Sequence, residues 1–381
     1  MIRNGIDRIA SEGKLFKGKR LGLITSPTGL NAEMKTTIRI LHENYHLAAL
    51  FSPEHGVRGD IPAGGMVDTY TDPATGVPVY SLYRKESKRL TPDMLDAVDT
   101  VVYDIQDVGV RYYTFISTML LALEDCAKAG KMFVVLDRQN PLGGVTVEGN
   151  VLKPEFSSFV GHYPLPVRYG LTAGELAVMA NDQMGWKADL HVVRCGGWKR
   201  GMLFPDTGAM WIHPSLGIPR FETALLYSGT CLFEGTNLSE GRGTAFPFEM
   251  IGAPYMDAER LTDEMNAMRL PGVWFRPAYF KPAASKHEGQ QCGGVQLHVT
   301  DWRAVRPLET GVKLLYAVKE RYEAFSFLPP IREGSRPFID LLGGDSLYRD
   351  ESIRPAELLE RYEAESRAFA EQKREYHLYE E

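Results

Sequence analysis

The densest group of reactive side chains lies in residues 52–59, which read SPEHGVRG. This segment places a carboxylate, Glu54, beside an imidazole, His55, and close to a guanidinium, Arg58. Carboxylates and imidazoles are the side chains that most often exchange protons with a substrate. The segment therefore indicates acid–base chemistry, with a surface ion pair between Glu54 and Arg58 as the structural alternative.

Seven further carboxylates stand in polar segments of the chain. Cleavage of a glycosidic bond needs two carboxylates, or one and another proton-transfer group; they lie about 5 Å apart in retaining enzymes and about 6.5–9.5 Å apart in inverting ones. Each has a structural alternative: Glu175 completes a capping box with the threonine three residues earlier, and Asp137 could form an ion pair with Arg138. Glu234 and Glu240 lie in a Gly/Ser/Thr-rich loop, which favours ligand contact over catalysis. The seven are Asp104, Asp107, Asp137, Glu148, Glu175, Glu234 and Glu240.

Four arginines fall in the same polar segments. A guanidinium binds a carboxylate through two parallel hydrogen bonds, so this shared location indicates an anionic small substrate. A salt bridge within the protein is the alternative for each of them. Tyr112 could offer a ring face to a sugar or lie in the core. The four are Arg58, Arg111, Arg138 and Arg242.

Other chemistries lack their sequence signatures. Neither GxGxxG nor GxxxxGK[ST] follows the first predicted strand, which argues against a dinucleotide cofactor, and no GxSxG elbow marks a serine hydrolase. The four cysteines are far apart, without a CxxC pair or a histidine at zinc-ligand spacing, so we expect reduced, mostly buried thiols. We expect neither a cofactor nor a metal.

The order of the predicted elements favours a mostly parallel sheet with helices on both faces. Apolar runs at residues 20–26, 47–51, 100–104 and 132–136 alternate with helical segments as in βαβ units. The last three runs end in segments rich in Asp, Glu, Arg and Asn. Because open α/β sheets bind ligands at the carboxyl edge of their strands, we expect these segments to line one cleft. Residues 59–76 are predicted to form a long irregular loop there.

A chain of 381 residues is long enough for two domains. The alternation stops near residue 148, and the proline-rich passage at residues 154–166 marks a boundary. We predict a Rossmann-like α/β catalytic domain over residues 1–160. A smaller α+β domain over residues 161–381 is predicted to complete the cleft and to end in a charged amphipathic helix from residue 355 onward.

Composition narrows the classes of partner. The net charge of -6, without any Lys/Arg run, argues against nucleic acid, and no stretch of about 18 apolar residues indicates a membrane span. The start of the chain has no secretory signal, which predicts a cytoplasmic location unless a leader has been removed. The sequence does not indicate an oligomeric state.

Taken together, the polar segments resemble the exo-β-N-acetylmuramidase family NamZ, glycoside hydrolase family 171. The resemblance implies a Rossmann-like N-terminal domain, a smaller C-terminal domain, and release of N-acetylmuramic acid from the non-reducing end of peptidoglycan fragments of the MurNAc-GlcNAc type. One departure is Gln139, where the family motif has proline. The motifs that carry the resemblance are SPEHG (52–56), DIQDVGVRYYT (104–114), LDRQNPLGG (136–144), EG (148–149), GLTAGELA (170–177) and FEGTNLSEGRGT (233–244).

We therefore predict an exo-acting glycosidase in which Glu54 is the general acid and Glu175 is the first choice for the second carboxylate, with Asp104, Asp107 and Glu148 in reserve. The alternative is a non-catalytic two-domain binding protein for an anionic amino sugar; a weaker one is a different hydrolase or lyase for an acidic small molecule. The expected substrate-binding residues are His55, Arg58, Asp107, Arg111, Tyr112, Asp137, Arg138, Asn140, Glu234, Asn237, Glu240 and Arg242.

Overall fold

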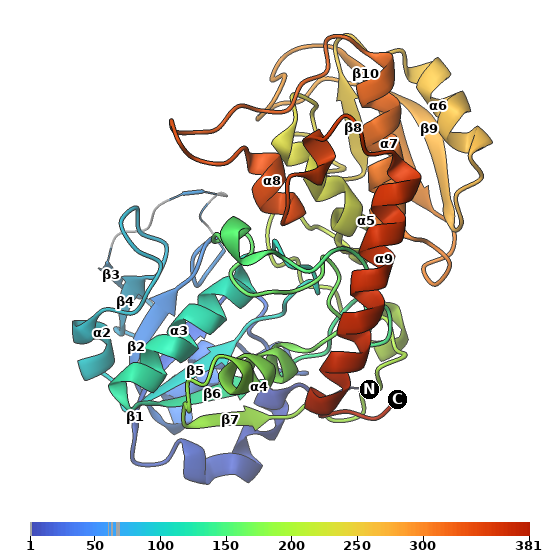
Figure 1. Ribbon diagram of the computed structural model, residues 1–381. Coiled ribbons are helices and arrows are strands. Elements are labelled where there is room, and N and C mark those ends of the chain that lie inside the picture. Colours follow the sequence, from blue (N-terminus) through green and yellow to red (C-terminus); the bar gives the residue numbers. More distant parts are fainter. Residues whose placement is uncertain (1, 60, 62–63, 66–68) are drawn as a thin grey trace. The chain divides into compact units, whose positions relative to one another are not determined.

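The computed structural model describes residues 2–59, 61, 64–65 and 69–381 and divides into two compact units (Figure 1). Unit 1 comprises residues 1–146, 169–219 and 370–381, and unit 2 comprises residues 147–168 and 220–369. Within the described residues, no helix combines the length and the apolar character needed to cross a membrane.

Unit 1 is built on a seven-stranded sheet. Six of its strands are parallel, and only the short edge strand β3 runs antiparallel to its neighbour β4. In spatial order the strands are β3 (Tyr70–Thr71), β4 (Pro78–Ser81), β2 (His46–Ser52), β1 (Arg20–Thr25), β5 (Thr100–Asp104), β6 (Met132–Leu136) and β7 (Leu190–Val193).

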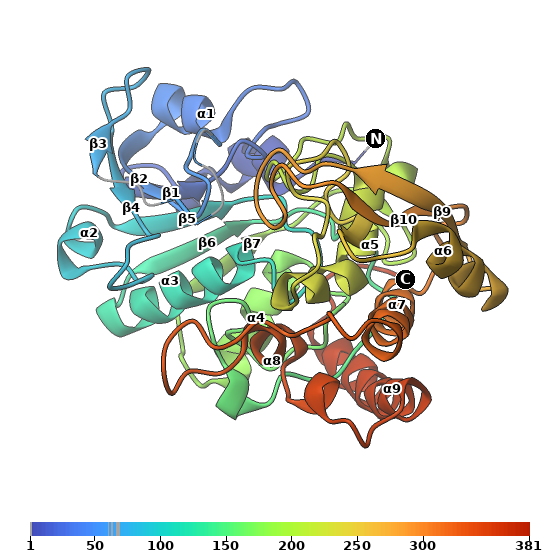
Figure 2. The ribbon, with the colours of Figure 1, turned by 90° about the horizontal axis from the view of Figure 1, so that it is seen from above.

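Helices cover both faces of this sheet. Figure 2 shows α1 on one face and α3 and α4 on the other. A strand enclosed in this way has no solvent face, and accordingly all five residues of β5 are buried. The helices of unit 1 are η1 (Gly5–Leu15), α1 (Thr37–Asn44), α2 (Pro92–Asp96), α3 (Phe115–Ala129), α4 (Ala173–Gln183), η3 (Phe204–Thr207) and η6 (Lys373–Tyr376).

Unit 2 contains a three-stranded antiparallel sheet in the order β8 (Met250–Ala253), β10 (Cys292–Val299) and β9 (Val273–Phe280). Helix α6 packs on β9 and β10, and α5 packs along α7. The prediction of a mostly parallel α/β sheet with a smaller α+β part is confirmed. The helices of unit 2 are η2 (Pro154–Phe156), α5 (Phe221–Thr230), η4 (Cys231–Gly235), α6 (Ala258–Ala267), α7 (Pro307–Arg321), α8 (Phe338–Gly343), η5 (Leu347–Arg349) and α9 (Pro355–Gln372), which runs across the division at residue 369.

The units do not divide at residue 160, where the sequence predicted the boundary. Strand β7 pairs in parallel with β6, so residues 169–219 belong to the first unit although they follow the proline-rich passage. The predicted C-terminal helix ends at Gln372, and η6 and the residues after it belong to unit 1. In the predicted loop at 59–76, residues 70–71 form β3, whereas residues 60, 62–63 and 66–68 lie outside the described residues.

Candidate active site

Glu54 lies at the carboxyl edge of the unit 1 sheet, two residues after β2 ends, and its side chain is half-buried. Both of its carboxylate oxygens accept hydrogen bonds. The Thr114 hydroxyl donates to Oε2 at 2.7 Å, and the backbone N–H of Gly64 donates to Oε1 at 3.0 Å. The carboxylate is therefore held from two directions, and the residue as a whole keeps part of its surface exposed.

Tyr83 and Lys88, which follow β4 in the chain, also interact with Glu54. Strand β4 pairs in parallel with β2, with Ser81 opposite Ser52, so the segments that follow the two strands begin side by side. Burial, followed by the charge of Glu54 and a hydrogen bond to it, raises the pKa of Tyr83 to about 12. The ammonium of Lys88 lies 3.3 Å from the centre of the Tyr83 ring, and burial lowers the pKa of this lysine.

Sequence reasoning missed Thr114, Tyr83 and Lys88. The available signal for the last two was the apolar run at residues 77–80, which is followed by tyrosine and lysine in the same way that the run at 47–51 is followed by Glu54. Thr114 gave no separate signal because a threonine before a helix is the ordinary N-cap residue.

His55 adopts a left-handed backbone conformation with φ 72°. This conformation is uncommon for a residue with a side chain, and such residues cluster at functional sites. The Nδ1 atom lies 3.3 Å from the carbonyl oxygen of Ile61, and the ring meets Phe115 edge-on at 6.3 Å between centres. His55 also lines a small pocket with Gly59, His213 and other residues of unit 1.

Arg58, predicted to bind substrate, forms an ion pair with the buried Asp72. Its Nη2 atom lies 2.9 Å from both carboxylate oxygens. About a third of the Arg58 side chain remains exposed. The Arg58 guanidinium is thus paired with a carboxylate of the protein, so the salt-bridge alternative describes its contacts in this structure.

Asp104 and Arg138 form a buried ion pair at the ends of β5 and β6. Arg138 donates from Nε at 2.6 Å and from Nη2 at 3.0 Å, and the Thr37 hydroxyl also donates to Asp104. The Asp104 carboxylate has no exposed surface, and Arg138 is 5% exposed. This geometry argues against a catalytic role for Asp104 and against substrate capture by Arg138, because the two groups are buried and bonded to each other.

Asp137 and Asn140 brace the segment after β6. Asp137 accepts hydrogen bonds from the Thr172 hydroxyl at 2.7 Å and from the backbone N–H of Gly174 at 2.8 Å, and burial raises its pKa to about 6. Asn140 donates to the carbonyl of Leu171 at 2.8 Å. Both side chains are buried, so their bonds orient the loop rather than a ligand.

Glu175 has no exposed surface. Its Oε1 atom lies 2.6 Å from Nη1 of Arg200 and accepts a hydrogen bond from the backbone N–H of Leu378, and its Oε2 atom accepts one from the N–H of Thr172. The capping-box alternative thus describes this residue. This burial argues against Glu175 as the second catalytic carboxylate, because each of its oxygens accepts hydrogen bonds within the protein.

Asp107, Arg111 and Tyr112 are buried in the segment that links β5 to α3. Asp107 accepts hydrogen bonds from the Tyr169 hydroxyl and from the backbone N–H of Gly109, and burial raises its pKa to about 6. At most 6% of each of these three residues is exposed, which argues against direct contact with a substrate.

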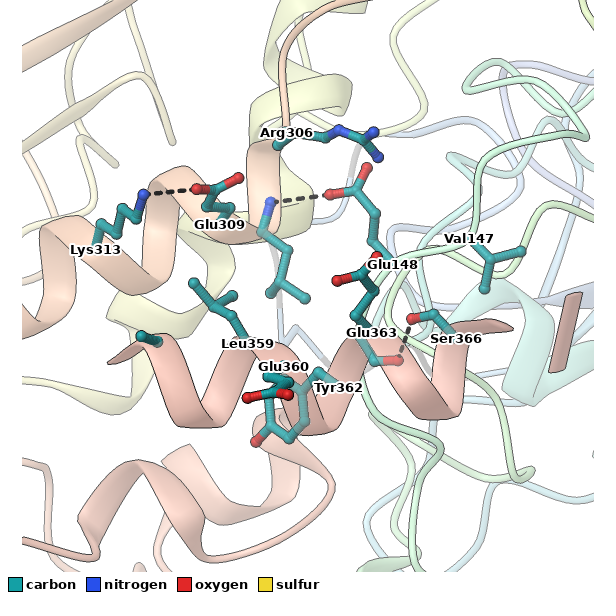
Figure 3. A pocket seen from close by; sticks show the side chains of 13 residues that line it. Val147, Glu148, Arg306, Glu309, Lys313, Leu359, Glu360, Tyr362, Glu363 and Ser366 are labelled. Carbon is teal, nitrogen blue, oxygen red and sulfur yellow. Dashed lines mark hydrogen bonds and ion pairs between the residues drawn. The ribbon is translucent and has the colours of Figure 1, made fainter. Parts of the chain in front are cut away.

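In unit 2, Glu148 lines a pocket of about 470 Å³ between residues of α7 and α9. Figure 3 shows its carboxylate between Arg306 and Glu363. The carboxylate is already bonded, to Nη1 of Arg168 at 2.8 Å and to the backbone N–H of Leu308 at 3.4 Å. Glu148 therefore joins two parts of unit 2, which argues against a catalytic role.

The polar loop at residues 234–242 is an ion-pair network within unit 2. Arg242 lies 2.8 Å from Glu234 and 3.4 Å from Glu240, and Lys286 lies 2.8 Å from Glu240. The Asn237 side chain accepts a hydrogen bond from the Tyr255 hydroxyl at 2.9 Å. These side chains hold the loop together, and Glu234 and Arg242 keep part of their surface exposed.

The sequence matches two family models along most of its length. They are described as exo-beta-N-acetylmuramidase NamZ, N-terminal, which matches residues 21–222, and exo-beta-N-acetylmuramidase NamZ, C-terminal, which matches residues 225–379. The chain is 45% identical to the peptidoglycan beta-N-acetylmuramidase NamZ of Bacillus subtilis (strain 168), with 99% of this chain and 91% of the relative aligned.

Two crystal structures of DUF1343 family proteins from Bacteroides fragilis NCTC 9343 share this fold. One superposes with a TM-score of 0.91 at 38% identity, and the other with a TM-score of 0.80 at 28% identity. Each comparison covers 100% of this chain and 99% of the other chain.

Proposed function

Because the chain belongs to the exo-β-N-acetylmuramidase NamZ family, we infer that it is a glycosidase that releases N-acetylmuramic acid from the non-reducing end of peptidoglycan fragments. The observation that carries this conclusion is the 45% identity to a peptidoglycan β-N-acetylmuramidase over 99% of the chain. The resemblance predicted from the polar motifs is confirmed. Because the family models and the Bacillus subtilis relative are described as muramidases, which are enzymes, we prefer the glycosidase to the non-catalytic binding protein.

We propose Glu54 as the general acid. Six of the eight candidate carboxylates are buried, and Glu234 forms an ion pair with Arg242, whereas Glu54 is partly open to solvent at the ligand-binding edge of the sheet. In the proposed step, Glu54 gives its proton to the glycosidic oxygen while the bond from that oxygen to the anomeric carbon breaks. The departing GlcNAc carries that oxygen away as a neutral hydroxyl, and Glu54 is left as a carboxylate. A water molecule supplies the new hydroxyl of the anomeric carbon and releases its second proton.

Tyr83 is proposed as a hydrogen-bond donor to Glu54 rather than as a base. A phenol whose pKa is raised to about 12 keeps its proton at neutral pH. His55, which follows Glu54 directly and lines the neighbouring pocket, is kept as a substrate-binding residue. The distance from Glu54 to the group that acts opposite it decides between a retaining and an inverting outcome. The cytoplasmic location stays a prediction.

The function is tested by incubating the protein with a MurNAc-GlcNAc disaccharide and following the products by NMR. We expect N-acetylmuramic acid and N-acetylglucosamine in equal amounts, and the anomer formed first distinguishes retention from inversion. Chitobiose, which lacks the lactyl group, is the matched control and is expected to react much more slowly. An intact MurNAc-GlcNAc disaccharide after prolonged incubation would contradict the proposed function.

A further inference from the structure

Thr114 occupies the N-cap position of α3, but its hydroxyl does not cap the helix in the part of the chain that the structure describes. The threonines that precede α1, α2 and α4 each accept a hydrogen bond from a backbone N–H of their own helix; they are Thr36, Thr91 and Thr172. Thr114 instead donates to Oε2 of Glu54 at 2.7 Å. The hydroxyl at this N-cap position thus forms a hydrogen bond with the candidate catalytic carboxyl group instead of with the helix.

The two oxygens of Glu54 have partners of different kinds. Oε1 accepts from the backbone N–H of Gly64, which can only donate. Oε2 meets the Thr114 hydroxyl, which can donate to a carboxylate and, after rotation, accept from a carboxylic acid. A proton on Oε2 therefore keeps the hydrogen bonds to Gly64 and Thr114, whereas a proton on Oε1 weakens the bond from Gly64. The Tyr83 hydroxyl, the third partner of Glu54, can both donate and accept, so it does not select between the two oxygens.

We propose that Thr114 is a positioning residue of the hydrolysis, which makes Oε2 the oxygen that carries and releases the proton of Glu54. This inference rests on the proposed role of Glu54 as the general acid. When Glu54 is protonated, the proton on Oε2 points to the Thr114 oxygen. When the proton passes to the glycosidic oxygen and the bond to the anomeric carbon breaks, the Thr114 hydroxyl turns and donates to the new carboxylate. Both protonation states of Glu54 are thereby held in one orientation.

The test compares Thr114→Val, which keeps the shape but removes the hydroxyl, with Thr114→Ser, which keeps the hydroxyl. Turnover of MurNAc-GlcNAc is measured across pH together with the melting temperature. For Thr114→Val we expect kcat to fall about 10- to 100-fold with KM changed less than about 2-fold. The basic limb of its pH profile moves to higher pH, because a donor that stabilises the carboxylate is gone. Thr114→Ser is expected to stay close to the parent protein in both respects.

Thr36→Val is the matched control, because Thr36 does cap its helix through the N–H of Arg39 at 3.2 Å. It is expected to lower the melting temperature and to leave kcat and the pH profile unchanged. If Thr114→Val does not fold, Thr114→Ala takes its place.

Parent-like kcat and pH profile in Thr114→Val, or an equal loss in Thr114→Ser, would overturn the inference. A variant that loses only thermal stability would overturn it as well. The Glu54→Gln variant separates these results from a failure of the proposed role of Glu54. If Glu54→Gln is active, Glu54 is not the general acid. If Glu54→Gln is inactive and Thr114→Val is fully active, only the role of Thr114 is contradicted.

Discussion

Glu175 and Arg200 form the most enclosed ion pair at the predicted site, with at most 1% of either side chain exposed and 2.6 Å between Oε1 and Nη1. The capping-box pattern that begins at Thr172 was visible in the sequence, and it described the local bonds of Glu175 correctly. The partner 25 residues further along the chain had no local signal. A carboxylate between strand-end motifs therefore suggested catalysis, while the fold uses it for structure.

Replacing Glu175 by glutamine tests this structural role. Removing one partner of a buried ion pair leaves an uncompensated charge, so we expect the free energy of unfolding to fall by about 3–5 kcal/mol. Turnover per folded molecule is expected to stay within about 2-fold of the parent protein. Urea denaturation and turnover of MurNAc-GlcNAc at low temperature measure the two effects.

Glu43→Gln is the matched control, because Glu43 forms ion pairs with Lys35 and Arg39 on the surface. Exposed pairs contribute little to stability, so we expect a much smaller loss of unfolding free energy than for Glu175→Gln. A folded Glu175→Gln protein that has lost turnover would return Glu175 to the role of second catalytic carboxylate.

At the scale of elements, the sequence predicted the central strands of the sheet accurately, whereas it did not predict the short strand β4 near the edge. Strands β5 and β6 have the predicted bounds, because burial on both faces makes a strand apolar throughout. The apolar residues at 77–80 were not predicted as a strand, although they include most of β4, after which Tyr83 meets Glu54. Pairing between strands depends on distant segments, which a local pattern does not contain.

Lys373, in the C-terminal element η6, is buried within unit 1. The Nζ atom of Lys373 donates to the carbonyls of Gly144 at 2.6 Å and Gly170 at 3.0 Å, and Arg200 donates to the same two carbonyls. Burial, followed by the charge of Arg200, lowers the pKa of Lys373 to about 7. His377, Glu175, Arg374 and Glu381 are the other charged or titratable groups around it.

Lys373→Met is expected to change the pH dependence of stability. A lysine whose pKa is lowered in the folded state stabilises the protein fully above its unfolded pKa and loses that contribution as the pH falls toward 7. The free energy of unfolding of the parent protein, taken relative to Lys373→Met, should therefore rise between pH 7 and pH 10, by up to about 4 kcal/mol. Urea denaturation at several pH values measures this difference. A difference that is flat across this range would show that Lys373 titrates normally.

On the scale of the whole molecule, the predicted boundary at residue 160 gives neither the start nor the extent of unit 2. The predicted loss of βα alternation near residue 148 coincides with the beginning of unit 2 at Val147. The chain then returns to unit 1 for residues 169–219 and again for residues 370–381, while the two family models meet between residues 222 and 225. Such returns are set by the pairing of β7 with β6 and by the contacts of Lys373, which composition does not reveal.

The central claim for the molecule is that Glu54 supplies the proton for glycosidic cleavage. The most direct measurement is the turnover of a MurNAc glycoside by Glu54→Gln, with the melting temperature as a check on folding. Because a glutamine amide cannot give up a proton to the leaving oxygen, we expect turnover to fall by about 10²–10⁴-fold while the protein stays folded. A chromogenic glycoside whose leaving group needs no protonation should recover much of the lost rate. Turnover of MurNAc-GlcNAc within a few-fold of the parent protein would contradict the account.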